Sequence, residues 1–226
     1  MEHFDFVGSL YKMKVNDALI SSLFQYDKVP SGDATPKLDS VTLTVSHRKR
    51  AQVNDLCNRL VKPMVECASR FMDVDAIVST VPGVNQPQSV WLHRGLIMQA
   101  CTPRTDANLK NGMKYLILNF TVENEVASYQ FEGIDEFGHR LQANYLLPIE
   151  PSVPDKSFWM SEGDVLRKMR LTFAVTYFSA QAATIRQPLR LEDLKHPHFT
   201  TRHLIVGLGR APLGHRVQLV GRPPSW

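Results

Sequence analysis

Three consecutive cations, Arg48-Lys49-Arg50, follow His47 and form the densest basic cluster of the sequence. Cations gathered in this way attract phosphate groups, whether of a nucleic acid or of an anionic lipid. They stand at the start of an expected helix, where positive charge opposes the helix dipole, so helix stability does not explain them. The cluster therefore indicates a phosphate-binding surface. No aromatic residue is interleaved with the cations, so stacking on the bases of a single strand is not suggested.

The last third of the chain carries an unequal balance of charge. Residues 157–226 hold 10 Lys and Arg against 4 Asp and Glu, a net of +6, whereas residues 1–156 hold 16 against 18. Nothing after Asp193 is acidic. This asymmetry predicts a second surface for phosphates, and a solvated basic face kept for solubility is the alternative. The candidate phosphate contacts of these two surfaces are His47, Arg48, Lys49, Arg50, Arg202, Arg210, Arg216 and Arg222.

Residues that could perform catalysis or hold a metal give little signal. His196, His198 and His203 form the densest histidine cluster, but zinc would need them to converge with a thiolate or a carboxylate. Histidines on either side of Pro197 are more typical of an exposed loop. The sequence has no GxSxG, P-loop, GxGxxG or HExxH motif. We therefore expect a protein that is not an enzyme and that has neither a metal nor a cofactor.

The elements that must position these residues are expected to be mostly strands. Apolar residues recur at helical spacing from Val53 to Phe71, which predicts one main helix with a kink at Pro63. The alternation in residues 41–45 predicts a strand that opens the core. A further helical turn is expected at residues 190–194. More strands are expected at residues 90–101, 113–122, 126–134, 141–149, 165–178, 203–208 and 216–220, the last two forming a terminal hairpin.

These elements predict the α+β class, with a twisted antiparallel β-sheet, one main helix packed on it and a flexible N-terminal arm. Residues 1–39 are expected to form the arm and its linker, and residues 40–226 the globular domain. Nowhere do 18 apolar residues run together, so no membrane span is expected, although attachment to a membrane surface is compatible with the sequence.

The order of these features resembles the matrix proteins of rhabdoviruses, of the vesiculovirus type in particular. In that family an arm and a linker precede a strand, a basic turn, a helix and a twisted sheet. The resemblance covers residues 41–220 in order and length, and it rests on pattern, not on an invariant motif. The matching stretches are Val41 to Arg50 with the helix from Gln52, Met113 to Val122, Tyr129 to Gly133, Tyr145 to Pro148, Arg170 to Tyr177 and His203 to Val220.

The resemblance implies a non-enzymatic matrix protein that self-assembles, binds the inner face of the membrane and the nucleocapsid, and drives virion assembly and budding. The implied partners are further copies of the chain, the viral nucleocapsid, an anionic membrane surface, an envelope glycoprotein tail and host proteins. The implied location is the virion envelope's inner face, the host cytoplasm and its membranes, with a nuclear role left open. The self-association arm would use Phe4, Phe6, Leu10, Leu19, Leu23 and Phe24, and its cations Lys12 and Lys14 would be further phosphate contacts.

The sequence departs from the pattern of that family in two respects. The arm is not rich in lysine, and the Pro-Pro-x-Tyr budding motif is missing, since Pro223-Pro224 is followed by Ser225-Trp226.

The alternative interpretation is a plant-virus movement protein of the tobamovirus type, which would bind single-stranded RNA with steep salt dependence. The aspartate expected at the end of an early core strand is not found there, because Tyr115 to Asn119 ends in Asn. An enzyme with an unrecognised site is the third interpretation.

Overall fold

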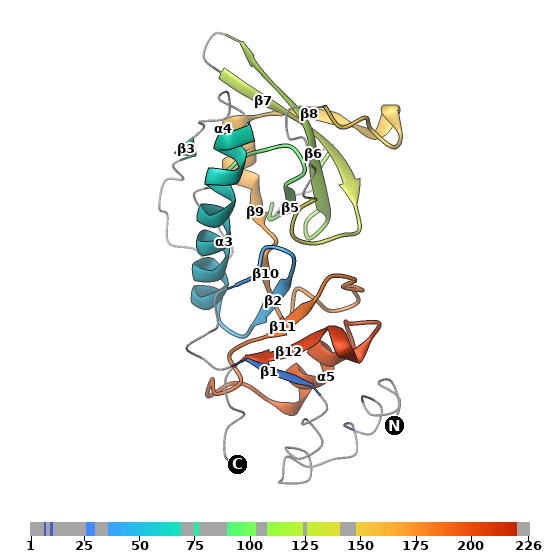
Figure 1. Ribbon diagram of the computed structural model, residues 1–226. Helices are drawn as coiled ribbons and strands as arrows, with labels where there is room; N and C mark the ends of the chain where they lie inside the picture. Colours follow the sequence, from blue (N-terminus) through green and yellow to red (C-terminus); the bar gives the residue numbers. More distant parts are fainter. Residues whose placement is uncertain are drawn as a thin grey trace. The chain divides into compact units, whose positions relative to one another are not determined.

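A computed structural model describes residues 7, 10, 26–29, 36–68, 75–76, 90–102, 108–123, 126–140 and 148–220 (Figure 1). The chain divides into two compact units. Residues 1–50 and 174–226 form the first unit, and residues 51–173 form the second. Both ends of the chain therefore contribute to one unit. The predicted division into an arm of residues 1–39 and a domain of residues 40–226 stays a prediction, because most of the arm lies outside the described residues.

The first unit is built on a parallel sheet of five strands. They are β1 (Asp27–Val29), β2 (Val41–Thr44), β10 (Ala174–Thr176), β11 (Leu189–Leu191) and β12 (Val217–Val220). Their order in the sheet is β1-β12-β11-β2-β10, and every neighbouring pair is parallel. All residues of β2, β10 and β11 are buried, as expected of a parallel sheet that is covered on both faces.

Helix α5 (Thr201–Leu208) connects β11 to β12 and packs closely on the sheet. The close approach depends on Gly207. A Cβ atom at this position would lie 2.8 Å from Cδ2 of Leu191 and 3.0 Å from Cε1 of Tyr177. The helix therefore needs a residue without a side chain where it meets β11. A short 3-10 helix, η4 (Gly214–Arg216), precedes β12.

The predicted main helix is confirmed as α3 (His47–Ala68), although it begins earlier than expected. It follows β2 after a turn of two residues, and the Ser46 hydroxyl accepts a hydrogen bond of 3.1 Å from the Lys49 amide, as a helix N-cap does. The basic cluster is therefore the first turn of the helix itself and not a turn before it.

The second unit contains an antiparallel sheet of five strands. They are β5 (Ile97–Ala100), β6 (Lys114–Glu123), β7 (Val126–Ile134), β8 (Phe158–Ser161) and β9 (Met169–Leu171), in the order β8-β7-β6-β5-β9. The strands predicted at residues 113–122 and 126–134 are confirmed as β6 and β7. The same unit holds β3 (Asp75–Ala76) paired with β4 (Val90–Trp91), η3 (Pro154–Lys156) and α4 (Glu162–Lys168).

The predicted α+β class with a single antiparallel sheet is wrong. The structure has a separate parallel sheet of α/β type, whose strands β2 and β11 pair across more than a hundred residues. An alternation of apolar residues predicts a strand but not its partner or direction, so the strand pattern was compatible with either sheet. Among the described residues, no helix is long and apolar enough to cross a membrane.

Several elements near the C-terminus also differ from prediction. Residues 203–208 were expected to be a strand of a terminal hairpin, but they belong to helix α5, which buries Leu204, Ile205 and Leu208 on one face. This spacing fits a helix as well as a strand, since short apolar runs are ambiguous. Residues 190–194 begin with strand β11 instead of a helical turn. The long strand expected at residues 165–178 is divided among α4, β9 and β10.

Candidate functional site

Three strands of the parallel sheet end at the same edge, and this edge has a special place in the topology. From β2 the sheet continues to β10 on one side, and from β11 it continues to β12 on the other. The strand order therefore changes direction between β2 and β11. In open α/β sheets, ligands bind outside the carboxyl ends of the strands at such a point. This edge is where a binding site is expected from the fold.

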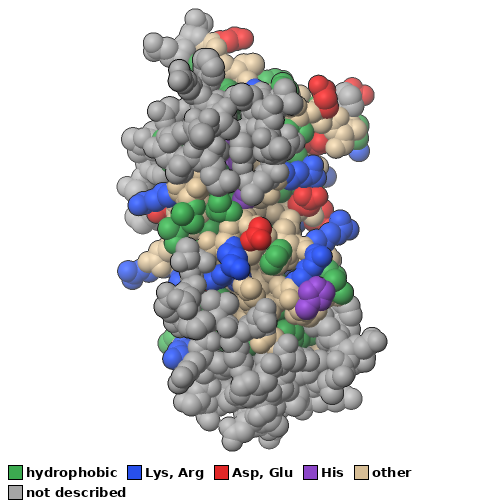
Figure 2. Space-filling view, viewed as in Figure 1, with side chains coloured by type: hydrophobic (Ala, Val, Ile, Leu, Met, Phe, Trp, Pro, Cys, Tyr) green, Lys and Arg blue, Asp and Glu red, His purple; other side chains and the backbone are tan. Residues whose placement is uncertain are grey.

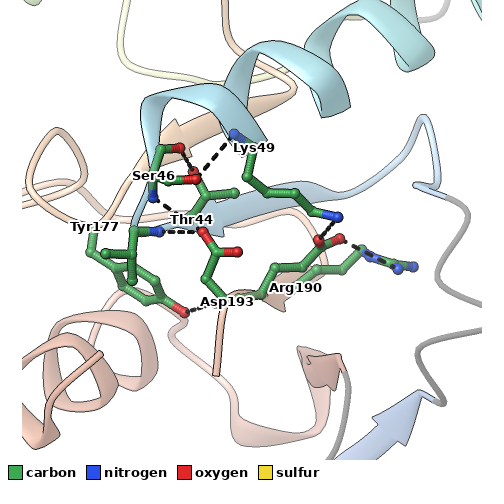
Figure 3. A network of polar contacts seen from close by, with 8 residues as sticks. Thr44, Ser46, Lys49, Tyr177, Arg190 and Asp193 are labelled. Atoms are coloured by element: carbon green, nitrogen blue, oxygen red, sulfur yellow. Dashed lines mark hydrogen bonds and ion pairs between the residues drawn. The ribbon is translucent and has the colours of Figure 1, made fainter. Parts of the chain in front are cut away.

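Between β2 and β11, the edge is filled by a network of the protein's own polar groups (Figure 3). Asp193, just after β11, accepts hydrogen bonds at Oδ2 from the amides of Val45, at 2.9 Å, and Ser46, at 3.1 Å. Asp193 has a φ of 62°, in the left-handed region that residues other than glycine seldom adopt. The two amides that follow β2 are thus occupied by a carboxylate of the same chain.

Two buried charges complete this network. The side chains of Arg190 and Glu192 are only 1% and 3% exposed, and Arg190 Nη2 lies 3.9 Å from Glu192 Oε1. Glu192 Oε2 also lies 3.0 Å from Lys49 Nζ. Because an isolated buried charge is costly, these three side chains depend on one another. The network closes this part of the edge and joins β11 to the first turn of α3.

Tyr177 links the network to its surroundings. The tyrosine hydroxyl donates a hydrogen bond of 3.1 Å to the backbone carbonyl of Glu192. Burial, together with the negative charges of Asp193 and Glu192, raises the pKa of Tyr177 well above its usual value, so the hydroxyl remains a donor. The ring of Tyr177 also lines a pocket, where it contacts the rings of Phe199 and His203.

A pocket of about 530 Å³ lies at the carboxyl end of β10, beside the network. Its apolar wall consists of Tyr177, Phe178 and Val206. The Phe178 side chain is the most unusual of the three, because 79% of the residue is exposed. A volume of this size is typical of a site for a small ligand or part of a larger one. The polar lining residues are Gln181, Thr200, Thr201, Arg202 and His203.

A tightly hydrogen-bonded turn presents Phe178 at the pocket. The Ala180 amide donates to the Thr176 carbonyl at 3.0 Å, and the Ser179 amide donates to the Thr176 hydroxyl at 3.1 Å. The Gln181 amide donates to the Phe178 carbonyl at 3.2 Å. Ala182, the next residue, has a φ of 63°, which is strained for alanine. Strained residues gather at functional sites, and Ala182 is one such residue close to the pocket.

The opposite wall of the pocket is formed by the start of α5. His203 Nδ1 accepts a hydrogen bond from the Thr200 amide at 3.1 Å, and its ring stacks on that of Phe199 with 5.7 Å between centroids. Burial, and the nearby His196, lower the pKa of His203, so its ring is neutral at neutral pH. Arg202, which is exposed, is therefore the permanent cation of the pocket.

The structure separates the predicted phosphate contacts of the basic cluster. His47, Arg48, Lys49 and Arg50 all lie in the first turn of α3. Arg48 is exposed, whereas Lys49 is paired with Glu192 and Arg50 is only 4% exposed. In the view of Figure 2, the Lys and Arg side chains of the described residues lie at several separate places, with acidic side chains among them.

Of the predicted contacts near the C-terminus, Arg202 lies at the pocket. Arg210 donates to the carbonyls of Val206 and Ala183, and Arg216 donates to that of Arg186. These two arginines stabilise backbone turns, and their role as phosphate contacts stays a prediction. Leu10 of the predicted arm is buried, with 1% exposure. The candidates that lie outside the described residues are Lys12, Lys14, Arg222, Phe4, Phe6, Leu19, Leu23 and Phe24.

Phe178 and Gln181 were not among the predicted site residues. Phe178 was expected at the end of a long strand, where an aromatic residue is ordinary. The available signal was the polar and small stretch Ser179 to Ala183, which cannot continue an alternating strand. The histidine cluster, in contrast, gives no metal site: among the described residues, no group of three His, Cys, Asp or Glu is placed to hold a metal ion.

Comparison with known proteins assigns the fold. No protein-family model matches the chain, and no curated protein matches it in sequence. Among solved structures, the Pif1 helicase from Candida albicans is similar with a TM-score of 0.54 and 13% identity, over 96% of this chain and 52% of that one. A Bacteroides Pif1 bound to ssDNA gives a TM-score of 0.48 and 12% identity, over 96% and 48%. The chain spans about half the length of these helicases.

These findings overturn the resemblance to rhabdovirus matrix proteins. The order of features that suggested it also fits an α/β fold in which strands from distant parts of the chain form one sheet. The expected matrix function, with its roles in virion assembly and budding, is wrong, and the movement-protein alternative gains no support. The expectation of a non-enzyme is contradicted as well, because the solved structures that share the fold are helicases. The chain therefore shares the fold of about half of the Candida albicans Pif1 helicase structure, and its first unit has a parallel sheet of α/β type.

Proposed function

We propose that the chain binds single-stranded nucleic acid at the carboxyl edge of its parallel sheet, as part of a helicase-like protein. The observation that carries the proposal is the exposed Phe178 ring in a pocket whose permanent cation is Arg202. Aromatic rings on which bases stack, next to cations that meet phosphates, are the usual means of binding single strands. The similarity to a helicase structure supports the same class of ligand.

The charge around the pocket also supports this proposal. The pocket's described lining residues include no carboxylate, and nothing after Asp193 in the sequence is acidic. The network fills the edge between β2 and β11, so the pocket at the end of β10 is the part of this edge that we expect to receive an incoming strand. The proposal concerns binding alone. Strand separation is an activity of whole helicases, and this chain covers only about half the length of the helicase that it resembles.

Fluorescence anisotropy with a labelled single-stranded DNA of about 16 nucleotides tests the proposal, since sites on such strands are of that size or smaller. We expect binding that weakens with rising salt, as phosphate neutralisation requires. Phe178→Ala should weaken binding about tenfold through lost stacking, and Arg202→Gln should weaken it and lower the slope of the salt dependence.

Two variants outside the pocket serve as controls. Trp159→Ala removes another exposed aromatic residue, which is 47% exposed on β8, and Arg167→Gln removes an exposed arginine of α4. Both should bind as the unaltered protein does. If no single-stranded DNA is bound, or if the pocket variants and the controls behave alike, the proposal is wrong.

A further inference from the structure

The turn after β10 presents two different side chains to the same pocket. Phe178 and Gln181 are three residues apart, and the hydrogen bond from the Gln181 amide to the Phe178 carbonyl closes the turn between them. Both residues line the pocket and both are exposed. A flat aromatic surface and a side-chain amide are therefore offered from one rigid turn.

The turn is held in this form before any ligand arrives. The Thr176 hydroxyl lies 2.9 Å from the Ser179 hydroxyl and accepts from the Ser179 amide, which fixes the start of the turn. The Ala183 amide donates to the Ala180 carbonyl at 3.2 Å, on the far side of the strained Ala182. A preorganised turn loses little conformational entropy on binding. The favourable free energy of contacts made by Phe178 and Gln181 is therefore offset only slightly by the cost of ordering the turn.

The chemistry of this pair differs from that of a site for a phosphate backbone alone. A backbone site needs cations and amide donors, and it treats all bases alike. A glutamine amide has one acceptor and two donors, so it can pair with the edge of a base, and its bidentate partner in nucleic-acid recognition is adenine. The pocket volume of about 530 Å³ is sufficient for a base with its sugar.

We infer that this pocket receives one unstacked base of the bound strand, holds it on Phe178, and favours adenine through Gln181. This inference rests on the proposed function, because it names what the same site recognises. Arg202 would meet the adjacent phosphate, which carries no base identity. The affinity of this protein for a nucleic acid would therefore depend on its base composition as well as on whether it is single-stranded.

Binding of oligo-dA, oligo-dC and oligo-dT of equal length tests the inference at one salt concentration. We expect oligo-dA to bind about tenfold more tightly than the two pyrimidine strands, which is the discrimination that one bidentate pair supplies. Gln181→Ala should reduce this ratio to about one while oligo-dT is still bound. Gln52→Ala, an exposed glutamine on α3, is the matched control and should keep the preference.

The outcomes separate this inference from the proposed function. If all three strands bind equally, or if a pyrimidine strand is preferred, base reading by Gln181 is wrong and single-strand binding stands. The inference is also overturned if the preference for oligo-dA persists in Gln181→Ala. If none of the strands binds, the proposed function itself fails. Circular dichroism of each variant shows whether the fold is retained, which is expected because Gln181 and Gln52 are both exposed.

Discussion

At the scale of single residues, Gly207 shows how one position without a side chain sets the packing of a whole helix. The nearest neighbours of an added Cβ atom would be the buried side chains of Leu191 and Tyr177. Tyr177 in turn lines the pocket and donates to the carbonyl of Glu192. The distance between α5 and the sheet therefore bears directly on the shape of the candidate site.

Gly207→Ala should destabilise the protein by about 1–3 kcal/mol, the usual cost of an extra group in a well-packed core. Alanine is the better helix former by about 1 kcal/mol, which offsets part of this cost. Gly163→Ala in α4 is the control, because nothing lies within 4 Å of an added Cβ there. This second variant should be neutral or slightly stabilised. Urea unfolding of both variants measures the difference, and equal stabilities would contradict the packing argument.

At the scale of elements, Asp193 connects strand β11 to the turn between β2 and α3. Its Oδ2 accepts from two consecutive amides, and its backbone is in the left-handed region. Aspartate is one of the few residues that adopt this conformation readily, because its short polar side chain bonds locally. Charge, hydrogen bonding and backbone geometry thus all favour aspartate here.

Asp193→Ala should lower the free energy of unfolding by about 2–4 kcal/mol, since two amides lose a charged acceptor and alanine is strained at this φ. Asp193→Asn keeps an acceptor oxygen and tolerates the left-handed region, so its cost should be under about 1.5 kcal/mol. Chemical denaturation of the two variants measures the costs. An Asn variant as unstable as the Ala variant would show that the charge matters more than the hydrogen bonds.

At the scale of the whole molecule, a buried histidine makes the stability of the second unit depend on pH. His93 of the second unit is fully buried, and its Nδ1 donates a hydrogen bond of 2.8 Å to the Arg94 carbonyl. Burial, and to a lesser extent the nearby His139, lower the pKa of His93 to about 4. The unfolded chain takes up this proton near the usual value of 6.5, so protonation favours unfolding.

The second unit should therefore lose stability as the pH falls from about 6.5 to about 4, by up to roughly 1.4 kcal/mol per pH unit from this residue. Above pH 7 the residue should contribute no pH dependence, because both states are then neutral. Denaturation across this range measures the slope, and His93→Leu should reduce it. His215→Gln, at an exposed position, should leave the slope unchanged. A titration of the His93 ring near 6.5 by NMR would contradict this prediction.

The sequence by itself determined the local elements whose signal is carried by neighbouring residues. The apolar spacing from Val53 onward predicted α3, and the alternating runs predicted β6 and β7, because both patterns depend only on residues a few positions apart. It also revealed the acid-free segment after Asp193, which now includes the pocket's Arg202.

Only the tertiary structure decided which strands are partners and where the site lies. The parallel pairing of β2 with β11 joins residues far apart in sequence, and no local pattern distinguishes it from an antiparallel sheet. For the same reason, the matrix-like order of elements was compatible with a different fold. Phe178 and Arg202 meet at one pocket because α5 returns its N-terminus to the carboxyl edge of the sheet. Their types are local to the sequence, and their proximity is a property of the fold.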